Sequence, residues 1–349
     1  MTTRRDFVLG TAALTASACH PQEPPPAGPV SPAPSAPQAR AARENSGMPK
    51  RRLGKTGVEV SALGLGGFHM GAAGSEEDGV RLVRAAIDEG ITFLDNCWDY
   101  NDGNSETRMG KALSGGYRQR VYLMTKIDGR TKRAALDQLH QSLRRLNTDV
   151  IDLVQIHEVI RPNDPERCFA PDGCVEALVD ARAAGKIRHI GFTGHKHPDL
   201  HRSMLATARK NDFAFDAVQM PLNVLDAHFR SFEREVLPEL TKDDIAVLGM
   251  KSCGSGDILK TGAVSPEECL RYALSLPTSV VISGMDSLEM LRKNLETVRR
   301  FTPLSDDERR QLLARTEPFA REGRHELFKT SEKFDGTARN PHWLEEARL

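Results

Sequence analysis

The stretch Phe93–Tyr100, FLDNCWDY, introduces a pattern that recurs along the chain. An apolar run ends in an acid, Asp95, and Tyr100 follows five residues later, before a polar turn that contains glycine. Two later apolar runs end in the same way, one with Lys126 and the other with His157. In a barrel of parallel strands, residues at the strand ends converge on one face. The pattern therefore predicts that these four side chains meet at one site.

Outward from this stretch, short apolar segments alternate with amphipathic ones, as in a parallel sheet with crossover helices. Strands are expected at residues 62–65, 92–94, 121–125, 151–156, 187–192, 217–220, 245–250 and 279–282. Helices are expected at residues 76–89, 105–113, 131–146, 173–184, 198–210, 230–240, 266–274 and 288–299. This alternation predicts an α/β fold, a (β/α)8 TIM barrel. A β-hairpin with a glycine turn precedes it, and a helix at 305–321 opens a C-terminal extension of helix and loop.

The glycine-rich segment Gly64–His69 raises the alternative of a doubly wound nucleotide-binding fold. That fold needs a third glycine, spaced so that a helix can start against a pyrophosphate, and an acid that closes the second strand. Neither stands at the expected place. We therefore expect a glycine-rich loop after the first barrel strand rather than a dinucleotide fingerprint.

The N-terminus has the features of an export signal. Residues 1–19 place Arg4 and Arg5 before a short apolar region and small residues, which predicts the twin-arginine export machinery and a periplasmic or cell-envelope location. Two outcomes stay open at Cys19: lipidation, which would tether the chain to a membrane, or simple cleavage after Ala18. Residues 20–47, rich in proline and alanine, predict a disordered linker.

Length, composition and net charge indicate the class of protein and its domains. The chain of 349 residues is 39% hydrophobic and 28% charged, with a net charge of zero. These values are typical of a globular protein, and they lack the basic excess of a nucleic-acid binder. We expect a barrel domain at residues 48–305, an extension at 306–349, and a monomer that acts on a small molecule.

The four strand-end residues suit one kind of chemistry. A phenol is a weak acid, with a pKa of about 10, and a nearby ammonium such as Lys126 favours its ionised form. Asp95 would hold that ammonium in place, and His157 would hydrogen-bond a substrate oxygen. Together they would give a proton to an oxygen that is gaining electrons, as happens when hydride reduces a carbonyl. This predicts reduction of an aldehyde, a ketone or a sugar carbonyl, with Tyr100 as proton donor.

Cysteine and histidine residues add two further expectations. An odd number of widely spaced cysteines follows the signal, which is not a disulfide framework. Cys168 and Cys174 flank a short loop, and whether they pair stays open. His195, His197 and His201 fall in a polar segment, and carbonyl reduction by the four residues needs no metal, so we expect no metal site.

Residues 48–305 resemble the aldo-keto reductase family. The resemblance rests on motifs spread along the barrel in the family's order: Leu53–Gly57, Leu63–Gly66, Phe93–Asp95 with Tyr100 and Ser105–Glu106, Thr125–Lys126, Gln155–His157, Gly185–Gly191, Gln219 with Asn223, and Ser283–Gly284 with Asn294.

This resemblance implies a role for each matched position. Asp95, Tyr100, Lys126 and His157 would form the catalytic tetrad. The residues that would bind a nicotinamide cofactor are Gly66, Gly67, Thr193, Gly194, Gln219, Met250, Cys253, Gly254, Ser283, Gly284, Met285 and Asn294. Phe68 and Trp98 would contact the substrate.

Alternatives remain open for both the cofactor and the function. NADP(H) is the family default, yet Asp286 stands where NADP-binding relatives usually carry cations, so NAD(H) stays open. A cofactor-binding barrel that senses redox state without catalysis is the main competing function. A metal-dependent barrel hydrolase would need a His-x-His pair after the first strand, where His69 stands alone.

Overall fold

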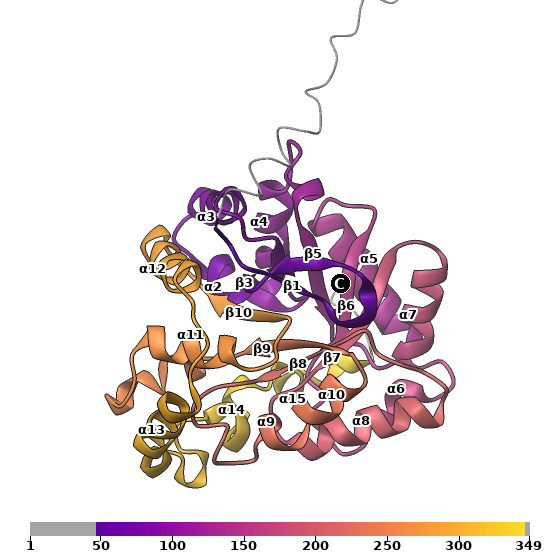
Figure 1. Cartoon of the computed structure of the whole chain (residues 1–349). Helices are drawn as coiled ribbons and strands as arrows, with labels where there is room; N and C mark the ends of the chain where they lie inside the picture. Colours follow the sequence, from indigo (N-terminus) through magenta and orange to yellow (C-terminus); the bar gives the residue numbers. More distant parts are fainter. Residues whose placement is uncertain (1–46, 346–349) are drawn as a thin grey trace, which may run out of the picture. The chain divides into compact units, whose positions relative to one another are not determined.

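The computed structural model describes residues 47–345; the predicted signal, Cys19 and the linker up to residue 46 lie outside the described residues, as do residues 346–349. Eight parallel strands close into a barrel in which each strand pairs with the next and the last pairs with the first (Figure 1). This confirms the predicted (β/α)8 TIM barrel. The strands are β3 (Leu63–Gly66), β4 (Phe93–Asp95), β5 (Tyr122–Ile127), β6 (Ile151–Ile156), β7 (Ile187–Thr193), β8 (Ala217–Pro221), β9 (Ala246–Met250) and β10 (Val280–Gly284).

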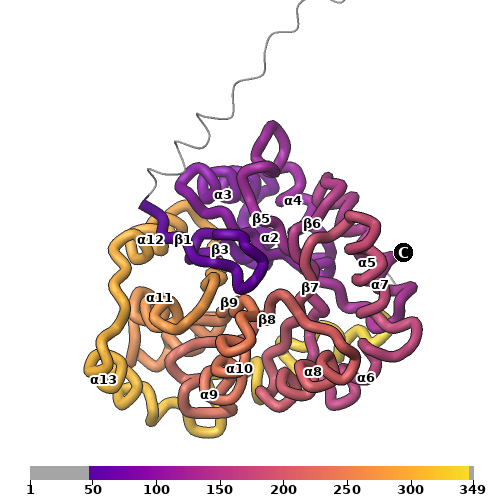
Figure 2. Tube along the Cα trace, turned by 45° about the vertical axis from the view of Figure 1, so that its right-hand side comes forward, coloured from indigo at the N-terminus to yellow at the C-terminus, as the bar shows by residue number. Residues whose placement is uncertain are grey.

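Helices surround the strands, as the tube view shows (Figure 2). Three of them, α3, α11 and α13, begin at a serine whose hydroxyl accepts a backbone hydrogen bond while an acid three residues on returns one, so each start is fixed locally. The helices are α2 (Gly67–Ala72), α3 (Glu76–Asp88), α4 (Asn104–Ala112), α5 (Lys132–Arg145), α6 (Asp164–Phe169), α7 (Cys174–Ala183), α8 (Pro198–Lys210), α9 (Phe232–Glu235), α10 (Leu237–Lys242), α11 (Pro266–Ser275), α12 (Leu288–Arg299), α13 (Asp306–Thr316), α14 (Leu327–Thr330) and α15 (Gly336–Arg339).

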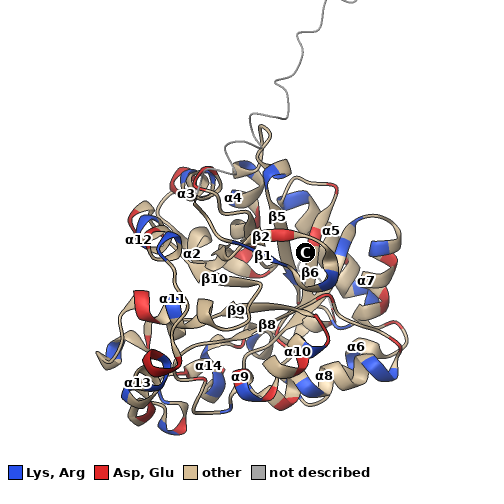
Figure 3. Cartoon of the chain, viewed as in Figure 1, with Lys and Arg blue, Asp and Glu red and all other residues tan. Residues whose placement is uncertain are grey.

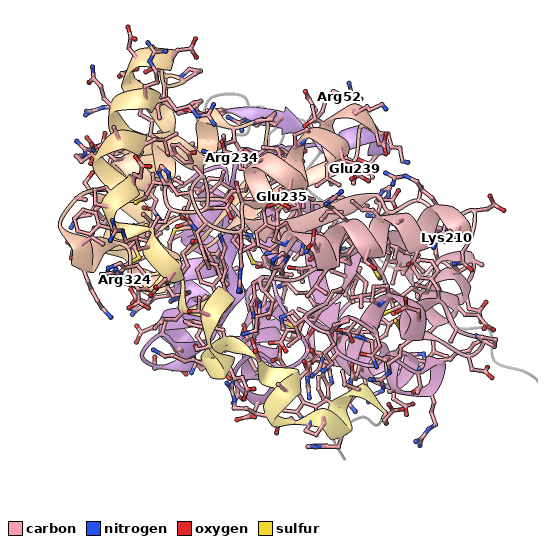
Figure 4. All side chains as sticks on the ribbon, turned by 90° about the horizontal axis from the view of Figure 1, so that it is seen from below. Arg52, Lys210, Arg234, Glu235, Glu239 and Arg324 are labelled. Carbon is pink, nitrogen blue, oxygen red and sulfur yellow. The ribbon has the colours of Figure 1, made fainter. Side chains whose placement is uncertain are left out.

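The predicted hairpin forms from β1 (Lys50–Arg52) and β2 (Glu59–Ser61), which pair antiparallel. Leu53 and Val60 are buried in a cluster with inward-facing strand residues, and this cluster fills one end of the barrel. Figure 4 shows Arg52 of the hairpin near the top, while the yellow C-terminal segment runs down one side of the barrel and its last part lies along the bottom. The hairpin therefore leaves the other end of the barrel to the extension.

Three local predictions were wrong. The helix expected at 230–240 is two helices, α9 and α10, because Pro238 in the first turn of α10 cannot donate a backbone hydrogen bond. The helix expected at 305–321 ends at Thr316, before Pro318. The glycine-rich loop after β3 is instead the start of α2 at Gly67.

The surface carries both signs of charge throughout. Lysine and arginine alternate with aspartate and glutamate along outer helices such as α3, α12 and α13 (Figure 3). Within residues 47–345, none of the helices is long and apolar enough to cross a membrane. Cys168 and Cys174 are both buried free thiols.

Candidate active site

The four strand-end residues meet at one end of the barrel. Asp95 ends β4, Lys126 lies near the end of β5, and His157 directly follows β6. Tyr100 begins the short 3-10 turn after β4, and its hydroxyl lies 3.2 Å from the Lys126 ammonium. That ammonium is buried, contacts the Asp95 carboxylate and donates to the backbone oxygen of Asn96 at 2.8 Å. The structure thus brings the predicted tetrad together.

The electrostatics of Tyr100 differ from the expectation. Burial, followed by the Asp95 carboxylate, raises the pKa of Tyr100 well above its ordinary value. The Lys126 ammonium beside the hydroxyl is itself paired with Asp95, and burial and the Asp95 charge set the direction of the shift. The phenol therefore keeps its proton across neutral pH, which a proton donor requires.

His157 has a buried partner that the sequence analysis missed. Its Nδ1 lies 2.9 Å from a carboxylate oxygen of Asp128, and Asp99 and Cys97 approach the same nitrogen at 3.7 and 3.3 Å. Burial alone would lower the pKa of His157, but the Asp128 and Asp99 carboxylates outweigh it and raise the pKa. Asp128 follows Lys126 by two positions, and in a strand that spacing places two side chains on the same face. That spacing was the available signal.

The same group bears on metal binding. In the described part of the chain, ligand atoms of Cys97, Asp99, Asp128 and His157 lie within 4.8 Å of one another, close enough to surround an ion. The hydrogen bond between His157 and Asp128 already gives two of these groups a partner. Burial and the Asp128 charge raise the pKa of Asp99 to about 7. A proton on Asp99 would therefore reduce the negative charge of this group without a bound metal ion.

The three histidines of the polar segment have separate partners. His195 contacts Asp335 at 2.9 Å, His197 accepts from the backbone of its own helix start, and His201 contacts the backbone oxygen of Gln219. Burial lowers the pKa of His201 to about 4. These contacts show no shared ligand position for the three rings.

Two predicted cofactor residues have unmatched polar atoms. Thr193, at the end of β7, and Gln219, on β8, are buried, and neither Thr193 Oγ1 nor Gln219 Oε1 has a hydrogen-bond partner. Gln155 on β6, which the sequence analysis did not assign to cofactor binding, has no partner for either side-chain amide atom. Buried polar groups are rarely left this way. A carboxamide both donates and accepts, so these residues fit the nicotinamide amide.

The other predicted cofactor residues lie around the same end of the barrel. A Cβ at Gly67 would lie 2.6 Å from the Asp95 backbone oxygen, and one at Gly194 would lie 2.4 Å from that of Val159, so backbone packing alone requires both glycines. Side-chain or backbone neighbours similarly crowd Gly66, Gly254 and Gly284. Asn294 donates to Ser283 at 3.0 Å. Met250 and Cys253 are half-buried, whereas Met285 is fully buried in the main core.

The two predicted substrate residues differ in position. Phe68 is 50% exposed, and its ring meets that of Tyr100 edge-on at 5.4 Å between centroids. Trp98 is fully buried, donates to Gln141 of α5 at 2.9 Å and packs edge-on against Trp343. Trp98 therefore joins the barrel to the extension, and substrate contact stays a prediction for both residues.

The C-terminal segment crosses this end of the barrel. Glu158, directly after His157, accepts two backbone hydrogen bonds, from Gly336 and Thr337, and one from the Thr337 hydroxyl. Asp335 contacts Lys196 at 2.7 Å as well as His195. The segment is thus attached to the loops that carry the tetrad.

The chain is similar to proteins of a known family. The model of the aldo/keto reductase family matches residues 62–266. Aldo-keto reductase YhdN of Bacillus subtilis is 30% identical over 232 residues, which are 62% of this chain and 64% of that protein, so the match spans less than two thirds of its length. The holo form of aldo-keto reductase AKR11C1 from Bacillus halodurans superposes with a TM-score of 0.65 at 25% identity, covering 80% of this chain and 99% of that one.

A second solved structure, the thermostable aldo-keto reductase Tm1743 in complex with the inhibitor epalrestat, superposes with a TM-score of 0.63 at 25% identity, over 77% of this chain and 100% of that one. The family consists of oxidoreductases that use nicotinamide cofactors. Asp95, Tyr100, Lys126 and His157 lie together within the barrel that the family model matches. The chain therefore belongs to the aldo/keto reductase family.

Proposed function

We propose that this chain reduces an aldehyde, a ketone or a sugar carbonyl to an alcohol with a reduced nicotinamide cofactor. The observation that carries the proposal is the Tyr100 hydroxyl, 3.2 Å from a buried ammonium that Asp95 neutralises. A bound reduced nicotinamide would supply hydride to the carbonyl carbon. Thr193, Gln155 and Gln219 would hold its carboxamide.

Residues of the chain would orient the carbonyl oxygen and supply its proton. As the carbonyl oxygen gains an electron pair, the Tyr100 O–H bond breaks and its proton forms the alcohol O–H bond. Lys126 would stabilise the resulting phenolate, because its ammonium lies within hydrogen-bond distance of that oxygen. His157 would orient the carbonyl oxygen, and the exposed Phe68 ring against Tyr100 would cover the reacting group. The carbonyl compound, one hydride and one proton together give the alcohol.

Replacing Tyr100 with phenylalanine tests the proposal. Tyr100→Phe removes the proton donor, so turnover should fall by about a hundredfold or more, while cofactor affinity stays within a few-fold of the parent. Carbonyl-dependent loss of reduced-cofactor absorbance measures turnover, and cofactor fluorescence measures affinity. Tyr117→Phe, at a tyrosine that contacts Asp88 away from the site, is the matched control.

The same measurements separate the competing function. A redox-sensing barrel without catalysis would bind cofactor but turn over no member of an aldehyde, ketone and sugar panel, even with Tyr100 intact. Turnover that persists in Tyr100→Phe would contradict the assigned proton donor.

A further inference from the structure

Lys251 directly follows β9, at the end of the barrel that carries the tetrad. Its backbone φ is +57°, a conformation that residues other than glycine seldom adopt. The half-buried side chain places its ammonium 4.8 Å from the ring centre of Phe334 and 5.3 Å from that of Phe328. Both rings belong to the C-terminal segment, so Lys251 lies between the barrel and the extension.

The Lys251 ammonium forms no hydrogen bond or ion pair with residues 47–345, although its charge interacts with Glu158, Asp335 and Asp95. Each of these acids is committed elsewhere. Glu158 accepts from Gly336 and Thr337, as described above. Asp335 contacts His195 and Lys196, and Asp95 contacts Lys126. A cation is therefore kept near the tetrad without an anion of its own.

Anchoring of the C-terminal segment does not explain why a charged side chain lies against these two rings. Ammonium–ring contacts at partly exposed sites stabilise only weakly, and an apolar side chain would pack on the same rings without the cost of partly burying a charge. Burial lowers the pKa of Lys251 to about 8, so the side chain remains mostly charged at neutral pH. A charge kept half-buried and unpaired suits an incoming anion.

Two anions could meet this ammonium, a phosphate of the cofactor or an acidic group of the substrate. The sequence favours the cofactor in that Lys251 stands between Met250 and Cys253, which are both predicted to bind it. The surroundings favour the substrate, because the Phe328 and Phe334 rings beside the ammonium belong to the C-terminal segment, and that segment is attached to Glu158, directly after His157.

We propose that Lys251 recognises an anionic group of the substrate, and that the natural substrates are carbonyl compounds that carry a carboxylate or a similar acidic group. This inference rests on the proposed reductase function. Lys251 would bind the acid while Tyr100 and His157 meet the carbonyl, so the acid would set orientation as well as affinity.

The test compares para-carboxybenzaldehyde with its methyl ester, which have the same reacting group and differ in charge. In Lys251→Met, the ratio of kcat/KM for the acid to kcat/KM for the ester should fall by about tenfold or more, the value of one hydrogen bond to a charged group. Lys251→Arg, which keeps the charge, should retain most of the ratio. Lys260→Met removes a lysine from the same loop region that is paired with Asp257, and it should leave the ratio unchanged.

A binding measurement keeps this inference separate from the proposed function. Benzoate should bind the cofactor-loaded full-length chain about tenfold more weakly in Lys251→Met when titrated by calorimetry. If the parent turns over neither these two aldehydes nor any member of the carbonyl panel, the reductase proposal fails, and the benzoate titration still decides the anion site. An unchanged ratio with unchanged benzoate affinity would overturn the inference. So would a Lys251→Met variant that loses cofactor affinity and treats acid and ester alike, because the ammonium would then serve the cofactor phosphates.

Discussion

The carboxylate of Asp128 decides which nitrogen of His157 can meet a substrate. A carboxylate only accepts hydrogen bonds, so the contact of 2.9 Å requires the proton on Nδ1. Nε2 then carries a proton only when the imidazole is doubly protonated. A carbonyl oxygen needs a donor, and the raised pKa of His157 keeps that donor available to higher pH. In the proposed reduction, Asp128 would therefore be a positioning residue that acts through His157.

Asp128→Asn should move the pH dependence of catalysis. The amide keeps an acceptor for Nδ1 but removes the negative charge, so the pKa of His157 falls. The doubly protonated ring is then lost at lower pH, and the alkaline limb of the kcat/KM profile should move down by about one pH unit. Rates of aldehyde reduction between pH 5 and 9 measure it, with Asp137→Asn on the outer face of α5 as control. An alkaline limb that stays in place would contradict this role.

At the level of single residues, the groups at strand ends could be predicted from the sequence. Asp128, which acts through its contact with His157, was not predicted. Asp95, Lys126 and His157 follow apolar runs, so their convergence could be predicted from the strand pattern. Lys251 stands in the same kind of position after β9, and this signal was overlooked. Trp98 could not be placed, because its burial depends on Trp343, which lies 245 positions away along the chain.

Among the secondary-structure elements, α14 is held by a buried charge network. The Lys329 ammonium contacts Asp226 at 2.7 Å and Glu326 at 3.0 Å, and all three side chains are buried. Asp226 also accepts from the backbone of Phe232 and Glu233 at the start of α9. One lysine therefore connects the extension with the segment that follows β8.

Lys329→Met should destabilise the protein by about 3–5 kcal/mol near pH 8, because two buried carboxylates lose their cation. Burial already raises the pKa of Glu326 to about 7 and raises that of Asp226. Without the lysine, the native state holds these protons to still higher pH than the unfolded chain does. Stability then falls as pH rises, so the loss should be smaller at pH 5 than at pH 8.

Urea unfolding at the two pH values measures this difference. Lys293→Met removes an exposed lysine paired with Glu289, and it should change the free energy of unfolding by less than about 1 kcal/mol. Adding Glu326→Gln to Lys329→Met should recover part of the loss at pH 8. Equal losses at both pH values would contradict the charge argument.

In the whole molecule, the barrel could be predicted and the path of the extension could not. Eight strands in alternation with helices are a local pattern repeated along the chain, and local patterns are readable from sequence. The extension is held by contacts between distant positions. One example is the Leu344 backbone oxygen, which accepts from Arg130 at 2.7 Å. Its polar composition with scattered aromatic residues specifies no such partner in advance.

The cofactor should stabilise the whole molecule, and both nicotinamide dinucleotides should do so to a similar degree. Saturation at about a hundred times the dissociation constant adds about 2.7 kcal/mol, which corresponds to a rise of about 5 °C in Tm for a chain of this size. Discrimination depends on cations near the adenosine ribose. Asp286, which the resemblance places near that ribose, is exposed, and Lys293 is paired with Glu289, so we expect a 2′-phosphate to gain little.

Thermal unfolding with increasing NADPH or NADH, and AMP as control, gives both dissociation constants. We expect them to agree within about tenfold, since one ion pair between exposed groups contributes less than about 1.4 kcal/mol. A preference for NADPH above about a thousandfold would require roughly 4 kcal/mol from the 2′-phosphate. Arg292, exposed on α12, would then have to bind that phosphate in a partly buried geometry, and Arg292→Met would abolish the preference.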